Sequence, residues 1–258
     1  DGQNWFGIIL RIIIPLSLPA IASVVSRGNV RNMSQPQGSS NQPIPGFIRL
    51  LTGYDRVLQT PSGNYRQVPQ GHSLPERLDQ FISDLDSGVI LSLPSHDCQF
   101  AGISYVFSTM KERLHLFDIG ERRSAEQVVD QVVTLLPTFK SSFYLFVNFT
   151  DVDDIGYRYR SGGRRYSMAF ESVDRSLGRL FDSLKKAGKW RKTDVWITTT
   201  YGYETNSNRY KNQKDLWVIG SVKSVKKGTT LDLVPTIYKR YGIDSLHWDP
   251  SLEGAPLF

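Results

Sequence analysis

Two short apolar segments, each followed at once by polar residues, constrain the fold of this sequence more than any other feature. Phe143–Asn148 and Val195–Thr200 are rich in aromatic and β-branched residues, as expected for strands that are buried on both faces. Helix-like segments alternate with such strands along the chain, and Ser167–Gly188 is the clearest of them. The alternation predicts an α/β fold with a mostly parallel central sheet flanked by helices on both faces.

Length and composition indicate one globular domain that spans residues 1–258. The chain is 40% apolar and 22% charged, which argues against wholesale disorder. Its net charge of +6 favours anionic partners such as nucleic acid, acidic glycans or phosphorylated ligands. A solvated, lysine-rich face is the commoner reason for such a charge.

The single cysteine, Cys98, excludes an intrachain disulfide and a zinc site with several cysteines. Trp5–Ala22 is the most apolar segment, but Arg11 interrupts it, so we expect buried core and no transmembrane segment. Asn29–Ile44 is polar and is expected to be a loop.

Six motifs occur in the order found in one superfamily of enzymes. They are Leu18–Gly28, Gly46–Gly53, Asp153–Tyr157, Val173–Gly178, Thr199–Gly202 and Asp232–Ile237. Together they resemble the alkaline phosphatase superfamily, which includes type I phosphodiesterases and sulfatases. Residues 54–140 match only in their general strand–helix pattern. The resemblance implies an alkaline phosphatase-like domain that starts after the family's first strand, and a tendency toward secreted or lumenal proteins.

The resemblance also implies a catalytic site, of which little is retained. Family enzymes bind two divalent metals, usually zinc, through Asp and His, and attack phosphate or sulfate esters with a Ser, Thr or modified Cys. Asp1 and Asp153 match metal-binding aspartates, and Pro43 lies near the nucleophile position. Tyr157, Thr200 and Tyr201 occupy positions where the family has ligands. The resemblance therefore implies a degenerate member with no cofactor, whose two aspartates are at most a weak, vestigial metal site.

Arginines alternate with tyrosines in the polar segment that follows the predicted strand Phe143–Asn148. The segment contains Tyr157, Arg158, Arg160, Arg164 and Arg165 around a Gly-Gly pair. Guanidinium groups in this setting indicate a binding site for phosphate, sulfate or a nucleic-acid backbone. The alternative is a solvated loop held by tyrosine packing.

These observations favour a catalytically inactive protein that acts as a binding or structural component. Its basic surface would face an anionic ligand or a larger protein assembly. One alternative is an atypical metal-dependent hydrolase or transferase of phosphoric or sulfuric esters, with zinc held by Asp1, Asp153 and Asp154. A second alternative is a nucleic-acid-binding protein that uses the arginine–tyrosine segment.

Overall fold

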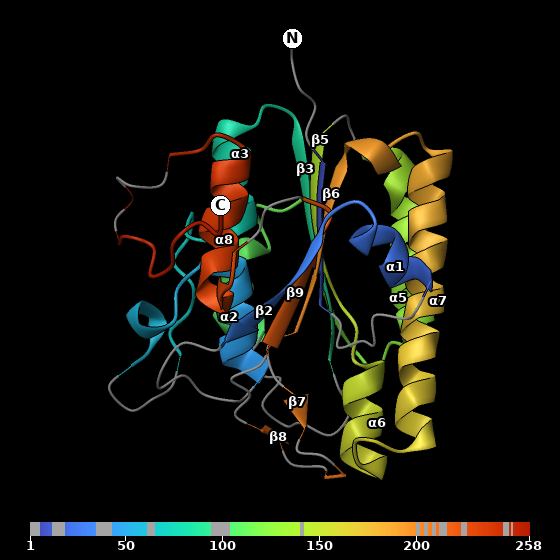
Figure 1. The fold of residues 1–258 in the computed structure, drawn as a ribbon. Coiled ribbons are helices and arrows are strands. Elements are labelled where there is room, and N and C mark those ends of the chain that lie inside the picture. Colours follow the sequence, from blue (N-terminus) through green and yellow to red (C-terminus); the bar gives the residue numbers. More distant parts are fainter. Residues whose placement is uncertain are drawn as a thin grey trace.

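A sheet of eight strands runs through the centre of the part of the chain that the structure describes, and Figure 1 shows it nearly edge-on. The computed structural model describes residues 6–11, 19–34, 43–60, 65–93, 104–139, 142–199, 202–203, 206–207, 210–211, 216–222, 226–244, 248 and 250–258. The strand order is β10-β2-β9-β6-β1-β5-β3-β4. The strands are β1 (Phe6–Arg11), β2 (Asn29–Ser34), β3 (Leu85–Leu93), β4 (Leu116–Glu121), β5 (Ser142–Asn148), β6 (Thr193–Thr198), β9 (Leu216–Gly220) and β10 (Gly228–Thr229).

The sheet is mostly parallel, as the sequence predicts. Only β9 runs against its neighbours β6 and β2, while the other pairs are parallel. The carboxyl ends of the parallel strands therefore meet at one edge of the sheet, the lower edge in Figure 1. A separate two-stranded sheet of β7 (Gly202–Tyr203) and β8 (Tyr210–Lys211) lies below this edge.

The first strand is the main departure from the expected fold. From the sequence, Trp5–Ala22 is expected to be buried core, in a domain that starts after the family's first strand. The structure forms β1 from Phe6–Arg11 and pairs it in parallel with β5 on one side and β6 on the other. The centre of the sheet is therefore built from this chain's own residues.

A second departure is β2, in a segment that the sequence predicts to be a loop. Asn29–Ser34 pairs antiparallel with β9 and parallel with β10. The polar composition of this segment gives no strand signal in the sequence. The strand forms because two neighbouring strands satisfy its backbone hydrogen bonds. Gly28 precedes it, and a Cβ at this position would lie 1.9 Å from the carbonyl oxygen of Gly220, so only glycine fits the turn.

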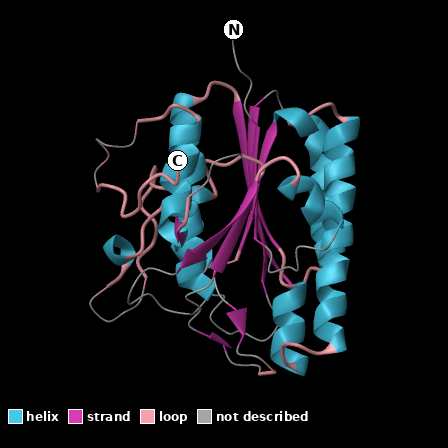
Figure 2. Cartoon of the chain, in the orientation of Figure 1, coloured by secondary structure: helices cyan, strands magenta, loops and turns pink. Residues whose placement is uncertain are grey.

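Helices cover both faces of the sheet, as Figure 2 shows. One face carries α2 (Pro43–Thr52), α3 (Leu74–Phe81) and α8 (Leu233–Arg240). The other carries α1 (Pro19–Val25), α5 (Ala125–Leu135), α6 (Asp151–Tyr159) and α7 (Arg164–Lys186). Each layer buries its own apolar cluster against the sheet, with Phe47 and Tyr238 in the first and Ile21 and Leu177 in the second.

The long helix α7 holds the short helix α1 in place. The buried carboxylate of Asp174 accepts hydrogen bonds from the backbone N–H groups of Ala20 (3.2 Å) and Ile21 (3.1 Å). These N–H groups are in the first turn of α1, where a helix has no internal acceptors for them. The aspartate of the Val173–Gly178 motif therefore has a structural role here.

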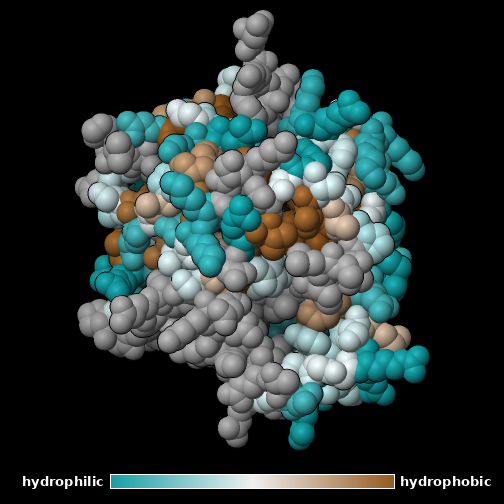
Figure 3. Space-filling model, in the orientation of Figure 1, coloured by the Kyte–Doolittle hydropathy of each residue, from teal (hydrophilic) through white to brown (hydrophobic). Residues whose placement is uncertain are grey.

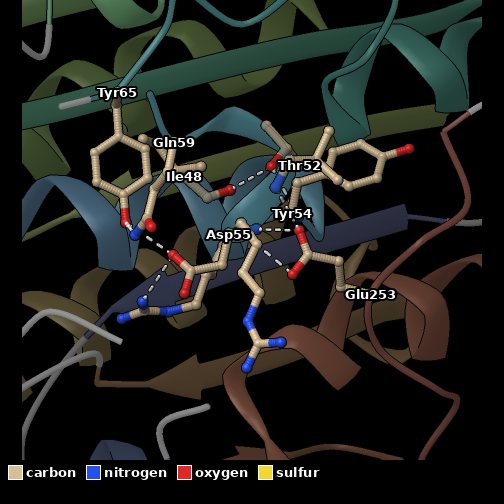
Figure 4. A network of polar contacts seen from close by, with 10 residues as sticks. Ile48, Thr52, Tyr54, Asp55, Gln59, Tyr65 and Glu253 are labelled. Carbon is tan, nitrogen blue, oxygen red and sulfur yellow. Dashed lines mark hydrogen bonds and ion pairs between the residues drawn. The ribbon is translucent and has the colours of Figure 1, made fainter. Parts of the chain in front are cut away.

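A carboxylate near the C-terminal end caps a turn near the N-terminal end of the described chain (Figure 4). Glu253 accepts hydrogen bonds from the backbone N–H groups of Asp55 (2.8 Å), Arg56 (3.2 Å) and Val57 (3.1 Å). Asp55 in turn accepts from the buried Arg49 at 3.3 Å and from the hydroxyl of Tyr65 at 2.8 Å. The C-terminal segment is thus fastened to the end of α2.

The surface seen in Figure 3 is mostly hydrophilic over the described helices, and a broad apolar area lies near the centre of the view. Among the described residues, no helix has both the length and the apolar character needed to cross a membrane.

Candidate functional site

The carboxyl ends of β3 and β5 are joined by buried polar side chains. The amide of Asn148 donates a hydrogen bond to the carbonyl of Ser92 at 2.7 Å. The hydroxyl of Ser92 donates to the carbonyl of Arg123 at 2.8 Å and lies 3.1 Å from the hydroxyl oxygen of Thr150. These contacts fix the corner from which α6 begins.

Asp153 and Tyr157 lie on α6, one turn apart. Asp153 is 7% exposed and Tyr157 is 41% exposed. Burial and the nearby charge of Asp153 raise the pKa of Tyr166 to about 12. Asp153 therefore lies at the packed junction of α6 and α7, whereas Tyr157 faces solvent.

The structure brings few of the other predicted site residues together. Pro43 is the first residue of α2, but its side chain is not among those described. Asp1, Thr200 and Tyr201 lie outside the described residues. Thr199, the last described residue before them, is buried.

The described side chains near the carboxyl ends of the strands do not provide the metal ligands of the two-metal centre that the resemblance implies. A zinc site takes its ligands from His, Cys, Asp and Glu. No three such side chains come together within the parts of the chain that the structure describes. On the face of α6 that carries Asp153, the next side chain at helical spacing is the phenol of Tyr157, a poor ligand for zinc.

The arginine–tyrosine segment is also mostly helical. Arg158 is in the last turn of α6, Arg160 follows that helix directly, and Arg164 and Arg165 begin α7. The guanidinium of Arg165 lies 4.2 Å from the centre of the Tyr159 ring, a cation–π distance. The two helices therefore present these arginines on structured backbone rather than on a flexible loop.

Two of the predicted binding residues, Arg158 and Arg165, line a pocket of about 730 Å³ between α6, α7 and the corner that precedes α5. Tyr157, Arg160 and Arg164 do not line it. The pocket also contains three arginines that sequence reasoning missed, namely Arg122, Arg123 and Arg175. The sequence signal for Arg122 and Arg123 was their adjacency directly before the capping residue Ser124, and Arg175 had none.

Two carboxylates share this pocket with the arginines. Asp151 accepts a hydrogen bond from the backbone N–H of Ala125 at 2.8 Å, which ties the start of α6 to the start of α5. Burial raises the pKa of Asp151, the charge of Asp154 raises it further, and the N–H of Ala125 opposes both effects. Five guanidinium groups against two carboxylates leave the lining positive, although Arg123 is paired with Asp118 outside it.

Comparisons with known proteins agree with this fold. Among solved structures, the chain is similar to the lipoteichoic acid synthase LtaP from Listeria monocytogenes, with a TM-score of 0.69, 15% identity, and coverage of 100% of this chain and 76% of that chain. It is also similar to an alkaline phosphatase superfamily protein from Vibrio parahaemolyticus, with a TM-score of 0.61, 16% identity, and coverage of 95% of this chain and 67% of that chain. A third is the alkaline phosphatase of the Antarctic bacterium TAB5 (TM-score 0.62, 9% identity, 94% and 98% covered).

No curated protein sequence matches the chain. The family model for type I phosphodiesterase / nucleotide pyrophosphatase matches residues 64–235, about two thirds of the sequence. That segment includes four of the parallel strands, β3 to β6, and the corner at Asp153. The chain therefore has an alkaline phosphatase-like fold and belongs to the type I phosphodiesterase / nucleotide pyrophosphatase family.

Proposed function

We propose that the protein is a catalytically inactive member of its family that acts as a binding or structural component and recognises an anionic partner. The observation that carries the proposal is the placement of Arg158 and Arg165 on α6 and α7, next to a corner whose ligand position is filled by Tyr157. Both arginines lie on the two helices that follow this corner, at the face of α6 that points away from Asp153.

The side chains at the family's ligand positions support the loss of metal chemistry. Tyr157, Thr200 and Tyr201 offer hydroxyl groups where the resemblance expects imidazole and carboxylate. A neutral hydroxyl binds zinc far more weakly than either of those groups. Pro43 has no nucleophilic atom to attack an ester.

Recognition of anions follows from the chemistry of the arginines. A guanidinium group stays charged at every physiological pH and pairs with phosphate or sulfate through two parallel hydrogen bonds. The arginines begin or end helices, so their backbone positions are fixed before a ligand arrives.

The first test measures metal content and turnover. The purified protein is treated with chelator, reloaded with zinc, and analysed for bound metal and for hydrolysis of an aryl phosphate, an aryl phosphodiester and an aryl sulfate. We expect less than stoichiometric zinc and no hydrolysis above the rate of an Asp153→Ala variant. Turnover that Asp153→Ala abolishes would instead establish the alternative of a metal-dependent hydrolase.

The second test measures binding to anionic polymers at several salt concentrations. A sulfated polysaccharide, polyphosphate and single-stranded DNA are compared, because phosphate and sulfate contacts both weaken steeply with salt. We expect Arg164→Gln/Arg165→Gln to weaken binding about tenfold. The control Lys226→Gln/Lys227→Gln removes the same charge from exposed residues elsewhere. Equal losses in both variants, or no binding at all, would contradict the proposal, and binding of DNA alone would identify a nucleic-acid-binding protein.

A further inference from the structure

The pocket between α6, α7 and the corner that precedes α5 does not include Asp153 or Tyr157, the residues at the family's metal-binding corner. An α-helix turns about 100° per residue, so residues four apart share a face. The residues of α6 that line the pocket, Asp151, Asp154, Ile155 and Arg158, follow this spacing. Asp153 and Tyr157 lie on the opposite side of the same helix. The pocket therefore lies against the face of α6 that does not carry Asp153 and Tyr157.

The α7 wall of the pocket has the same regularity. Its lining residues, which recur at intervals of three and four, are Arg165, Met168, Ala169, Ser172 and Arg175. The middle of this stripe is small or apolar, and an arginine stands at each end. With Ile155 of α6 it forms an apolar floor bordered by guanidinium groups.

The third wall is the corner between β4 and α5. Arg122 has a φ angle of +54°, in the left-handed region that few residues other than glycine adopt, and its backbone N–H donates to the carbonyl of Leu93 at 3.1 Å. Arg123 binds Asp118 at 2.6 Å, Gln131 at 2.8 Å and the carbonyl of Leu91 at 2.8 Å. Arg123 therefore braces the corner, while Arg122 stands exposed at the pocket.

We infer that this pocket binds a small organic ester of phosphate or sulfate. Its volume of about 730 Å³ lies in the range of small-molecule sites, which is about 300–1,000 Å³. Arg165 and Arg175 stand at opposite ends of the α7 wall, so the tetrahedral anion is received at one end, by Arg122 and Arg175, and the apolar floor receives the organic part of the ligand. The carboxylates of Asp151 and Asp154 repel a second anionic group and accept hydrogen bonds from hydroxyl groups, which favours a hydroxylated ester with its charge at one end.

This inference rests in part on the proposed function, because Arg158 and Arg165 belong to both sites. Arg122 and Arg175 belong to the pocket alone, while Arg160 and Arg164 lie outside it. These two pairs carry equal charge, so replacing one pair or the other separates the pocket from the wider basic surface.

The test is a calorimetric titration of the full chain with a hexose phosphate, a hexose sulfate, the parent hexose, inorganic phosphate and inorganic sulfate. We expect one ester to bind at a 1:1 ratio and the uncharged hexose not to bind. The two esters distinguish phosphate from sulfate as the preferred anion. Arg122→Gln/Arg175→Gln should weaken binding at least tenfold, while Arg160→Gln/Arg164→Gln should change it less than twofold.

A steric variant distinguishes loss of the binding site from loss of the fold. Ser172→Phe fills the pocket without changing the charge and should abolish ester binding while the thermal unfolding midpoint stays near that of the parent. If both arginine pairs weaken ester binding equally, or if Ser172→Phe leaves it intact, the pocket assignment is wrong. Failure to bind either ester overturns this inference but leaves polymer binding, and so the proposed function, in place. Metal-dependent turnover overturns the proposed function but leaves the pocket.

Discussion

Two arginines of the candidate sites have positive φ angles, which are unfavourable for residues that carry a Cβ atom. Arg122 has φ +54°, and Arg160, which ends α6, has φ +66° with ψ 155°. The second combination is almost confined to glycine and costs on the order of 1–3 kcal/mol for any other residue. Such strain persists only where the surroundings enforce it, and both positions here adjoin the candidate sites.

Replacement of Arg160 tests this strain. We expect Arg160→Gly to raise the free energy of unfolding by about 1 kcal/mol, because relief of the backbone strain exceeds the entropy that glycine adds to the unfolded chain. Arg160→Ala removes the same side chain but keeps the Cβ atom, so it should give no gain. Urea unfolding of both variants provides the measurement, and equal stability of the two would show that the backbone is unstrained.

At the scale of elements, the sequence predicts those strands and helices whose own residues determine them. Phe143–Asn148 lies in β5 as predicted, and the predicted helix Ser167–Gly188 lies largely within α7. Where packing against other elements determines a strand or helix, the local sequence does not predict it. Polar residues obscure β2, and Gly156, a poor helix former, lies in the middle of α6.

The junction of α1 and α7 is the clearest element-scale contact to test. Asp174→Ala should lower the free energy of unfolding by about 2 kcal/mol, since two N–H groups of α1 lose a charged acceptor inside the core. Amide hydrogen exchange in α1 should speed up more than exchange in α7.

The control for this change lies on the same helix. Asp182 is exposed and pairs with Lys185 at 2.8 Å, so Asp182→Ala should change stability by less than about 0.5 kcal/mol. Comparable losses in the two variants would mean that Asp174 does not act through α1.

At the scale of the whole molecule, the candidate pocket depends on residues that only the tertiary structure brings together. Arg122, Arg158 and Arg175 come from three different elements, and no spacing in the sequence connects them. The arginine–tyrosine segment could be identified because its members are adjacent in the chain. The pocket could not, because it forms only where α6 and α7 pack beside the corner that precedes α5.

Buried tyrosines make the whole fold sensitive to alkaline pH. Burial raises the pKa of Tyr166 to about 12, and raises the pKa values of Tyr144, Tyr238 and Tyr241 well above their usual range. The folded state keeps these protons while the unfolded chain releases them near pH 10. Stability is therefore fully present below pH 10 and is lost as the pH rises toward 12, by about 1.4 kcal/mol per pH unit for each tyrosine.

Urea unfolding at pH 9, 10 and 11, followed with tyrosinate absorbance, measures this loss. We expect the urea midpoint to fall steeply above pH 10 and absorbance to rise together with unfolding. Tyr166→Phe removes one of these groups and should make the fall less steep. Ionisation of all tyrosines near pH 10 in a chain that stays folded would contradict the assignment.

The position of β1 has a consequence for biosynthesis. Phe6 pairs with Phe143 of β5 and with Thr193 of β6, so the central strand has no partner until most of the chain has been made. An apolar strand that leaves the ribosome long before its neighbours exposes unpaired N–H and C=O groups to other chains. Contacts between residues so distant in sequence also form slowly. Production of this protein in cells will therefore depend on chaperones that keep the N-terminal segment apart from its copies until β6 emerges.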